Sequence, residues 1–279
     1  MSNSTLTSTQ TSSSAGKLLS GKQAVIFAAG GAVGAALASE FAAQGANVFL
    51  SGRHLEPVQR VATAVQDAGG LAQIATIDAL DEGAVTTYLD GVALQAGGID
   101  IVVNAMGPLP SEYSNGRNTL ELPLEHFMVP LTTLLPSQFV TARAAARHMV
   151  KQSSGVILFI TAVPSRGMAN VTAIGSTFGA MESLARCLAV DLGPAGVRVV
   201  AIRSGAMVDT STIQQSMQRV AQAMSISPAQ AQARLEQATL LKRLPVAADT
   251  ARLAAFLASD GARSITGAIV NASSGAAVD

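Results

Sequence analysis

QAVIFAAGGAVGAALASEFAAQG, residues 23–45, joins a short apolar run to an alanine-rich run through a glycine-containing turn. The apolar run, 23–28, is nearly continuous rather than alternating, which is typical of a strand covered on both faces in a parallel sheet. The alanine-rich run, 32–45, consists mainly of good helix formers. The stretch therefore predicts a strand, a tight turn and a helix, the first elements of a β-α-β unit.

The same alternation continues to the end of the chain. Each further apolar run precedes a longer helical pattern, which predicts parallel strands joined by right-handed crossovers. We expect an α/β fold: a doubly wound, Rossmann-type parallel sheet of about seven strands with helices on both faces. The expected strands are 23–28, 46–51, 72–77, 99–104, 155–161, 197–202 and 267–272. The expected later helices are 55–68, 82–96, 124–150 (interrupted by Pro130 and Pro136), 173–191, 211–223, 228–240 and 247–259.

Size and composition agree with one domain. The chain has 279 residues, of which 49% are hydrophobic and 13% charged, and this is enough for one large core. Its formal net charge is zero, so neither nucleic acid nor a membrane surface is an expected partner. Residues 1–20 are rich in Ser and Thr and predict a disordered tail, followed by a single domain over 21–279. No secretory signal or bilayer-spanning run is evident, so the expected location is the cytoplasm.

Four stretches spread along the chain resemble the short-chain dehydrogenase/reductase superfamily, in its compact single-domain branch. They are TIDALDEGAV (76–85), GGIDIVVNAMG (97–107), LAVDLGPAGVRVVAIRSGAMVDT (188–210) and AAFLASDGARSITGAIVNASSG (254–275). Each stretch alone is a weak signal, and their order and spacing together are a strong one. The resemblance covers roughly residues 20–279 and implies a nicotinamide dinucleotide held at the carboxyl ends of the strands.

The turn after the first strand is the expected phosphate site, because the N–H groups and dipole of a helix N-terminus favour anions. Where the family has three glycines this chain has Ala28, Ala32 and Gly34, and the Ala32 methyl is expected to hinder close approach of a phosphate. A plain tight turn without a ligand is the alternative. The cofactor-binding candidates of the turn are Gly30, Gly31, Val33 and Gly34.

The second strand ends in LSGRHL (50–55), without the carboxylate that usually accepts a hydrogen bond from the ribose of NAD. Arg53 is available instead and favours a 2′-phosphate, hence NADP(H). Alternatively, Arg53 is a solvated residue at the start of a helix. The resemblance adds Asp78 and Ala79 beside the adenine, and Asp78 is also a candidate N-terminal cap for helix 82–96. The remaining cofactor candidates are Asn104, Ala105 and Gly205.

The family's catalytic side chains are largely missing. Alignment on residues 188–210 puts Ile174 at the tyrosine place and Phe178 at the lysine place, and neither side chain transfers a proton. The asparagine place falls near Leu134. The serine place falls at Thr161 or Ala162, so Thr161 is a catalytic candidate.

Tyr113, in the loop after the fourth strand, is the best substitute acid in kind. The other polar residues near the expected site are better explained as loop caps or surface groups. No metal site is predicted.

Two functions are weighed most heavily. The first is an NADP(H)-dependent oxidoreductase with an altered active site, which transfers hydride to a hydrophobic imine or iminium, enone or carbonyl substrate under a helical lid at about 208–240. The alternative is a catalytically inactive homologue that binds a dinucleotide or serves as a partner subunit. A non-redox isomerase, cyclase or lyase has no positive feature in the sequence. The resemblance also implies a homo-oligomer, a dimer or tetramer, formed through helices 124–150 and 173–191.

Overall fold

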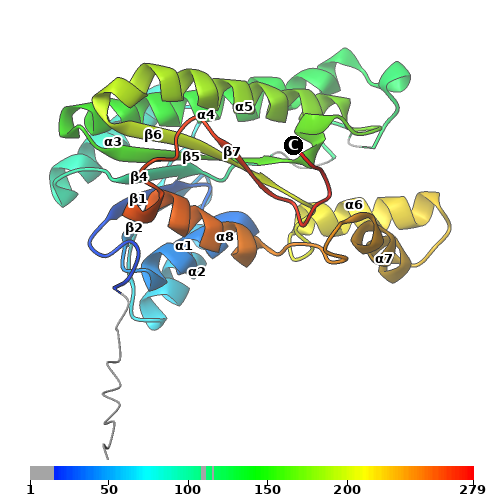
Figure 1. The fold of residues 1–279 in the computed structure, drawn as a ribbon, viewed down its shortest axis with the longest axis horizontal. Helices are drawn as coiled ribbons and strands as arrows, with labels where there is room; N and C mark the ends of the chain where they lie inside the picture. Colours follow the sequence, from blue (N-terminus) through cyan, green and yellow to red (C-terminus); the bar gives the residue numbers. More distant parts are fainter. Residues whose placement is uncertain (1–15, 108–110, 115) are drawn as a thin grey trace, which may run out of the picture.

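The computed structural model describes residues 16–107, 111–114 and 116–279. It contains one parallel sheet of seven strands in the order β3-β2-β1-β4-β5-β6-β7, with helices on both faces (Figure 1). This confirms the predicted doubly wound fold. The strands are β1 (Gln23–Phe27), β2 (Asn47–Gly52), β3 (Leu71–Thr76), β4 (Ile101–Asn104), β5 (Gly155–Ala162), β6 (Val197–Ser204) and β7 (Ile269–Ala272).

Helices form a layer on each face of the sheet. One layer consists of α1 (Ala32–Ala43), α2 (Leu55–Asp67) and α8 (Ala247–Ala258), and the other of α3 (Glu82–Ala96), α4 (Leu124–Gln152) and α5 (Thr172–Leu192). Two more helices, α6 (Ser211–Ala223) and α7 (Pro228–Ala238), stand apart from both layers (Figure 1). Short 3-10 turns are η1 (Thr119–Glu121), η2 (Val163–Arg166), η3 (Gly193–Ala195) and η4 (Asp260–Ala262).

The continuous apolar strands contribute side chains to two separate cores, one on each face of the sheet. Successive side chains of a strand point to opposite faces, so Leu158 packs toward α1 and α8 while Phe159 packs toward α4 and α5. Both side chains are buried. Ile202 and Ala201 of β6 divide between the two cores in the same way. This two-sided burial explains why the strand sequences lack polar alternation.

The prediction that prolines interrupt the fourth long helix was wrong. Helix α4 runs for 29 residues through both Pro130 and Pro136. Pro130 and the neighbouring Leu134 are buried in the protein, and α4 packs against both α3 and α5. Tertiary packing along the helix therefore outweighs the loss of a backbone hydrogen bond at each proline.

The packed domain begins before residue 21. Residues 1–15 of the expected tail lie outside the described residues, but Leu19 is fully buried and its N–H donates to Gln44 O at 2.9 Å. Leu19 belongs to the core under α1, so the start of the domain was placed too late. Within the described part of the chain, no helix combines the length and the apolar character needed to cross a membrane.

Candidate active site at the carboxyl edge of the sheet

The turn between β1 and α1 adopts the backbone conformation of a glycine turn although it begins with alanine. Ala28 has φ of +54°, in the left-handed region that glycine favours. Helix α1 then starts after Gly31, whose position provides no side-chain cap, and its first turn contains no acidic residue. The N–H groups of this first turn are therefore available to an anion.

The glycines of the turn have different roles. A Cβ at Gly34 would lie 2.6 Å from Ala28 O, so Gly34 allows the helix to pack closely on the turn. A Cβ at Gly30 would lie 2.6 Å from Pro57 Cβ, which makes Gly30 a packing glycine as well. A Cβ at Gly31 would make only an ordinary contact, 3.7 Å from Ala28 O, and both Gly31 and Ala32 are exposed. The side that a phosphate would approach is thus not filled by the chain itself.

Arg53 follows β2 directly and is exposed. Within the residues that the structure describes, its guanidinium makes no hydrogen bond or ion pair. The alternative role of Asp78 as the cap of α3 was wrong, because Asp81 is the N-cap and accepts from Ala84 N at 3.0 Å. Asp78 instead accepts from Leu80 N in a tight turn after β3, and the adjacent Ala79 is buried.

Asn104 at the end of β4 connects the sheet to α4. Its side-chain Nδ2 lies 3.2 Å from Ser137 Oγ and its Oδ1 accepts from Met106 N at 3.0 Å. Its carbonyl accepts from Gln138 Nε2. The side chain is 2% exposed, so its polar atoms are used inside the protein. Ala105 and Gly205, the other candidates on this side, lie at the carboxyl ends of β4 and β6.

The face of α5 that turns toward the sheet is apolar at the positions where the sequence resemblance places the catalytic tyrosine and lysine. Ile174 is 5% exposed, and Phe178 is partly buried against the same core. Residues four apart share a face of a helix, so Glu182 continues the row of Ile174 and Phe178. The first ionisable group of this row therefore stands one turn below the lysine place.

Glu182 forms a buried cluster with groups from three other elements. Arg203 of β6 donates from Nε to Oε1 at 2.9 Å and from Nη2 to Oε2 at 2.8 Å. Ser165 of η2 and Thr161 of β5 both donate to Glu182 Oε1, at 2.7 and 3.1 Å. Glu182 and Arg203 are 4% and 2% exposed. Thr161 is 1% exposed, so its hydroxyl is committed to this cluster, which favours a positioning role over direct contact with a substrate.

Hydrogen bonding keeps this pair ionised despite its burial. Burial by itself raises the pKa of Glu182, but hydrogen bonds from Arg203, Ser165 and Thr161 outweigh it and hold the pKa below its usual value. The hydrogen bond to Glu182 raises the pKa of Arg203 above its usual value, against the opposing effect of burial. Sequence reasoning missed the pair. The available signal was an arginine directly after the apolar run 199–202, combined with the i, i+4, i+8 spacing on α5.

Tyr113 lies in the loop between β4 and α4 and is 4% exposed. Burial raises the pKa of Tyr113 to about 12, with a smaller lowering effect from the positive charge of Arg219 on α6. The phenol therefore remains protonated at neutral pH and can donate a hydrogen bond. It releases a proton less readily than an ordinary tyrosine, which weakens it as a general acid.

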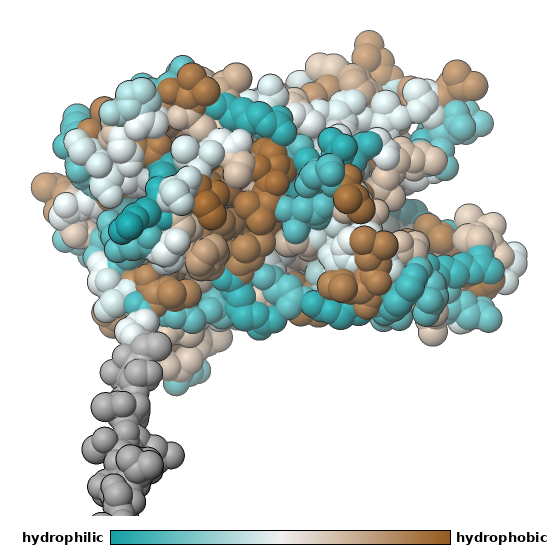
Figure 2. All heavy atoms as spheres, viewed as in Figure 1, coloured by the Kyte–Doolittle hydropathy of each residue, from teal (hydrophilic) through white to brown (hydrophobic). Residues whose placement is uncertain are grey.

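The predicted lid forms its two helices, α6 and α7, close to the predicted ranges. Figure 2 shows the surface hollowed between this helical pair and the layer above it, and apolar side chains gathered near α7. Leu240 and Leu241, just after α7, are 68% and 63% exposed. The segment expected to be a lid therefore presents apolar surface beside the carboxyl edge of the sheet.

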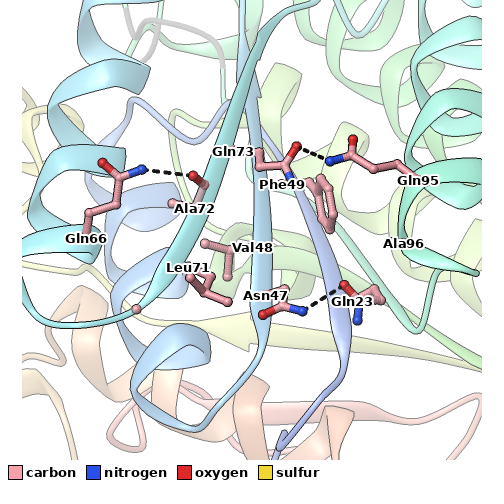
Figure 3. Close-up of a pocket in the computed structure, with 11 residues that line it drawn as sticks. Gln23, Asn47, Val48, Phe49, Gln66, Leu71, Ala72, Gln73, Gln95 and Ala96 are labelled. Atoms are coloured by element: carbon pink, nitrogen blue, oxygen red, sulfur yellow. Dashed lines mark hydrogen bonds between the residues drawn. The ribbon is translucent and has the colours of Figure 1, made fainter.

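A surface cavity of about 340 Å³ lies at the opposite edge, where β1, β2 and β3 begin (Figure 3). Its lining includes side-chain amides that hydrogen-bond to each other or to the backbone, such as Asn47 Nδ2 to Gln23 Oε1 at 3.2 Å and Gln95 Nε2 to Gln73 Oε1 at 2.9 Å (Figure 3). This cavity is separate from the residues that the sequence predicted for the cofactor, because those follow the carboxyl ends of the strands.

Comparisons with known sequences extend over almost the whole chain. The profile of a family described as enoyl-(acyl carrier protein) reductase matches residues 28–277. The 7alpha-hydroxysteroid dehydrogenase of Escherichia coli (strain K12) is 29% identical over 258 residues, which cover 92% of this chain and 94% of the relative. The versicolorin reductase stcU of Emericella nidulans is 26% identical over 266 residues, which cover 95% of this chain and 99% of the relative.

Solved structures share the fold. NAD+-bound xylitol dehydrogenase has a TM-score of 0.84 at 25% identity, over 91% of this chain and 98% of that one. An actinorhodin polyketide ketoreductase with NADPH also has a TM-score of 0.84, over 91% and 97%, but at 20% identity its likeness shows the fold alone. The relatives carry the names of oxidoreductases, and these two structures hold nicotinamide dinucleotides. Since the family profile spans nearly all of the fold described above, the chain belongs to the short-chain dehydrogenase/reductase superfamily.

Proposed function

We propose that the protein is an NADP(H)-dependent oxidoreductase with an altered active site. The observation that carries this proposal is Arg53: an exposed guanidinium without a partner in the described chain, directly after β2, where no carboxylate stands. A guanidinium suits a 2′-phosphate, and an absent carboxylate removes the usual preference for a ribose hydroxyl. The left-handed Ala28 and the uncapped N-terminus of α1 would hold the pyrophosphate.

The substrate class follows from what surrounds the hydride acceptor. When bound, the cofactor supplies a hydride. Ile174 and Phe178 offer no proton, and Tyr113 holds its proton tightly. A substrate that does not need a protein acid therefore fits best: an iminium ion arrives already protonated, and an enone or carbonyl can take its proton from water. The apolar side chains of α5 and the lid favour a hydrophobic substrate.

The ribose on the nicotinamide side would lack its usual anchor, because Phe178 replaces the lysine. Contacts to that half of the cofactor would come from apolar packing and from the backbone at the ends of β5 and β6. We therefore expect the adenosine phosphate contacts to provide most of the cofactor affinity.

The second candidate is a non-catalytic, dinucleotide-binding relative or a partner subunit. It is favoured by the loss of the acid and the ribose anchor together. We propose a dimer or tetramer of the cytoplasm in either case. Helices α4 and α5 pack against each other and leave large apolar side chains exposed, including Phe139 (39%), Val150 (41%) and Val190 (75%).

Thermal unfolding with NADPH, NADH, NADP+ and NAD+ tests the cofactor proposal. A ligand at about 100-fold excess over its dissociation constant stabilises the folded state by roughly 2.7 kcal/mol. We expect a clear shift with NADPH and a smaller one with NADH. No shift with any nucleotide would reject the proposal. A panel of cyclic imines, enones and ketones then separates the two candidates: NADPH oxidation with any of them supports the enzyme, and binding without turnover supports the inactive relative.

A further inference from the structure

Two arginines at the carboxyl edge of the sheet converge on one carboxylate. Nη1 of Arg203 donates to Asp279 Oδ1, and Nε of Arg166 lies 3.8 Å from the same oxygen. Arg166 is the last residue of η2, which follows β5, and Arg203 stands one residue before the end of β6. The carboxylate therefore lies at the carboxyl edge of the sheet, between η2 and the end of β6.

Arg203 does not need Asp279 to balance its charge. Both oxygens of Glu182 already pair with its Nε and Nη2, in a two-point arrangement that matches a guanidinium to a carboxylate. Nη1 is directed away from this pair and toward Asp279. Without Asp279, the cluster of Arg166, Arg203 and Glu182 carries one net positive charge and has a free donor. The protein thus builds a site for one further anionic group.

Asp279 is held at this site from one side only. Its side chain is 47% exposed and that of Arg166 is 50% exposed, so their ion pair contributes little free energy, and the buried Arg203, 2% exposed, supplies the stronger contact. Asp279 lies in the segment after β7, which is hydrogen-bonded to the base of the lid through Leu241 N to Ser274 O at 3.1 Å. Figure 1 shows this segment running back from β7 to the mark C, near the green ribbon of the β5–α5 connection. An external carboxylate could replace Asp279 without disturbing the Glu182–Arg203 pair.

We propose that Arg166 and Arg203 form a carboxylate subsite, so that the substrate is a hydrophobic molecule with one carboxylate, and that Asp279 fills the subsite when no substrate is bound. The apolar face of Ile174 and Phe178 and the apolar lid would receive the body of the molecule, while the arginines would orient it. A site that holds a single Asp side chain has the size of a carboxylate. The proposal rests on the proposed function, since it names the substrate class of that same site.

The test measures binding by isothermal titration calorimetry on the full chain with saturating NADPH. The probes are 4-phenylbutanoate and its neutral counterpart 4-phenylbutanamide. In the wild type, the acid binds only to molecules in which Asp279 has left the subsite, and this fraction lowers the apparent affinity. Asp279→Ala leaves the subsite open in every molecule, so we expect it to bind the acid about tenfold more tightly than the wild type. The amide should bind both proteins equally. Asp67→Ala, which changes an exposed aspartate on α2, is the matched control and should leave the acid affinity unchanged.

A second variant tests the subsite independently, in case Asp279→Ala also alters the fold. Arg166→Gln should weaken the binding of 4-phenylbutanoate and make that binding less dependent on salt concentration. Binding of the amide should not change. Equal affinities of the acid in wild type and Asp279→Ala, or absence of acid binding to Asp279→Ala, overturn the proposal. The NADPH-induced thermal shift of the same samples separates the two failures. A normal NADPH-induced shift without binding of the acid rejects the carboxylate subsite alone. An absent shift rejects the cofactor proposal. In that case, titrations of the acid without NADPH still test the subsite.

Discussion

The two halves of the carboxyl edge have responded differently to substitution. In the half formed by β1–β3, Ala28 replaces a glycine of the family, yet it adopts the left-handed conformation that the turn requires. In the half formed by β5, β6 and α5, Ile174 and Phe178 stand where the sequence resemblance places a tyrosine and a lysine, and both pack against the core. A site made of backbone N–H groups survives a side-chain change as long as the dihedral angles remain accessible. A site made of side chains disappears with them.

The second half has not become simply apolar. Glu182 and Arg203 form a buried ion pair one helical turn after Phe178, linked to Thr161 and Ser165. We therefore expect the backbone-made site at the β1–α1 turn to tolerate substitution, and the Glu182–Arg203 cluster not to tolerate it. Four changes test this contrast.

The largest effect is expected for Glu182→Ala, which removes the buried two-point partner of Arg203 and leaves only the half-exposed Asp279 beside its guanidinium. Breaking a buried pair from one side typically costs about 3–5 kcal/mol, and urea unfolding measures the change. The exposed pair of Glu56 and Arg60 supplies the control, since Glu56→Ala should cost less than about 1 kcal/mol. Similar losses for both variants would contradict the contrast.

The same pair predicts a pH dependence. Because the pKa of Glu182 is lower in the folded than in the unfolded protein, its stabilising contribution is present at neutral pH. The contribution is lost as the pH falls below the usual range of a glutamate and through the lowered folded value. Acid titration of unfolding should show this loss in the wild type and not in Glu182→Ala.

Gly34→Ala tests whether the backbone-made half has a limit. The new Cβ would lie 2.6 Å from both Ala28 O and Ala29 Cα, which are backbone atoms that cannot move aside easily. We expect a loss of about 1–3 kcal/mol in urea unfolding and a smaller NADPH-induced thermal shift. Gly91→Ala in α3, which meets no atom within 4 Å, should instead stabilise the protein by about 0.5–1 kcal/mol. A harmless Gly34→Ala would mean that the turn adapts more than its geometry suggests.

Arg53→Gln tests the proposed 2′-phosphate contact at the end of β2. A hydrogen bond to a charged group contributes about 1.5–3 kcal/mol, so the dissociation constant for NADPH should rise about tenfold or more while that for NADH stays the same. Fluorescence titration measures both constants. Arg60→Gln, on the adjacent helix, should change neither. Equal weakening of NADPH binding and NADH binding would contradict the proposal that Arg53 binds the 2′-phosphate.

Ala28→Gly has the smallest expected effect. An alanine in the left-handed region is strained by about 1–2 kcal/mol, and part of the relief is offset by the greater freedom of glycine in the unfolded chain. The free energy of unfolding should therefore rise by about 0.5–1 kcal/mol, with NADPH binding retained. Ala64→Gly, at an exposed position within α2, should lower it by about 1 kcal/mol. Destabilisation at both positions would show that Ala28 carries no strain.

Sequence reasoning was strong for the order of elements and weak for contacts between distant residues. The strand and helix patterns, including both lid helices, follow from local periodicity. Asp78 was one predicted alternative for the N-terminal cap of α3, but the cap is Asp81. The end of a helix is predicted only to within a few residues, so the neighbouring aspartate could not be distinguished. Thr161 was identified by its position at the end of a strand, but its hydroxyl faces a buried glutamate 21 residues away in sequence.

Local patterns are enough to predict the doubly wound sheet, and the residue order alone shows Ile174, Phe178 and Arg53 at their positions. These depend on local patterns and on which residue occupies a position. The folded structure was needed to show that α4 continues through its prolines, that Ala28 adopts a positive φ, and that Arg203 meets Glu182 and Asp279, the latter 76 residues away. The physical reason is that such contacts depend on how whole elements pack against each other, and packing combines the contributions of many residues that no short stretch of sequence contains.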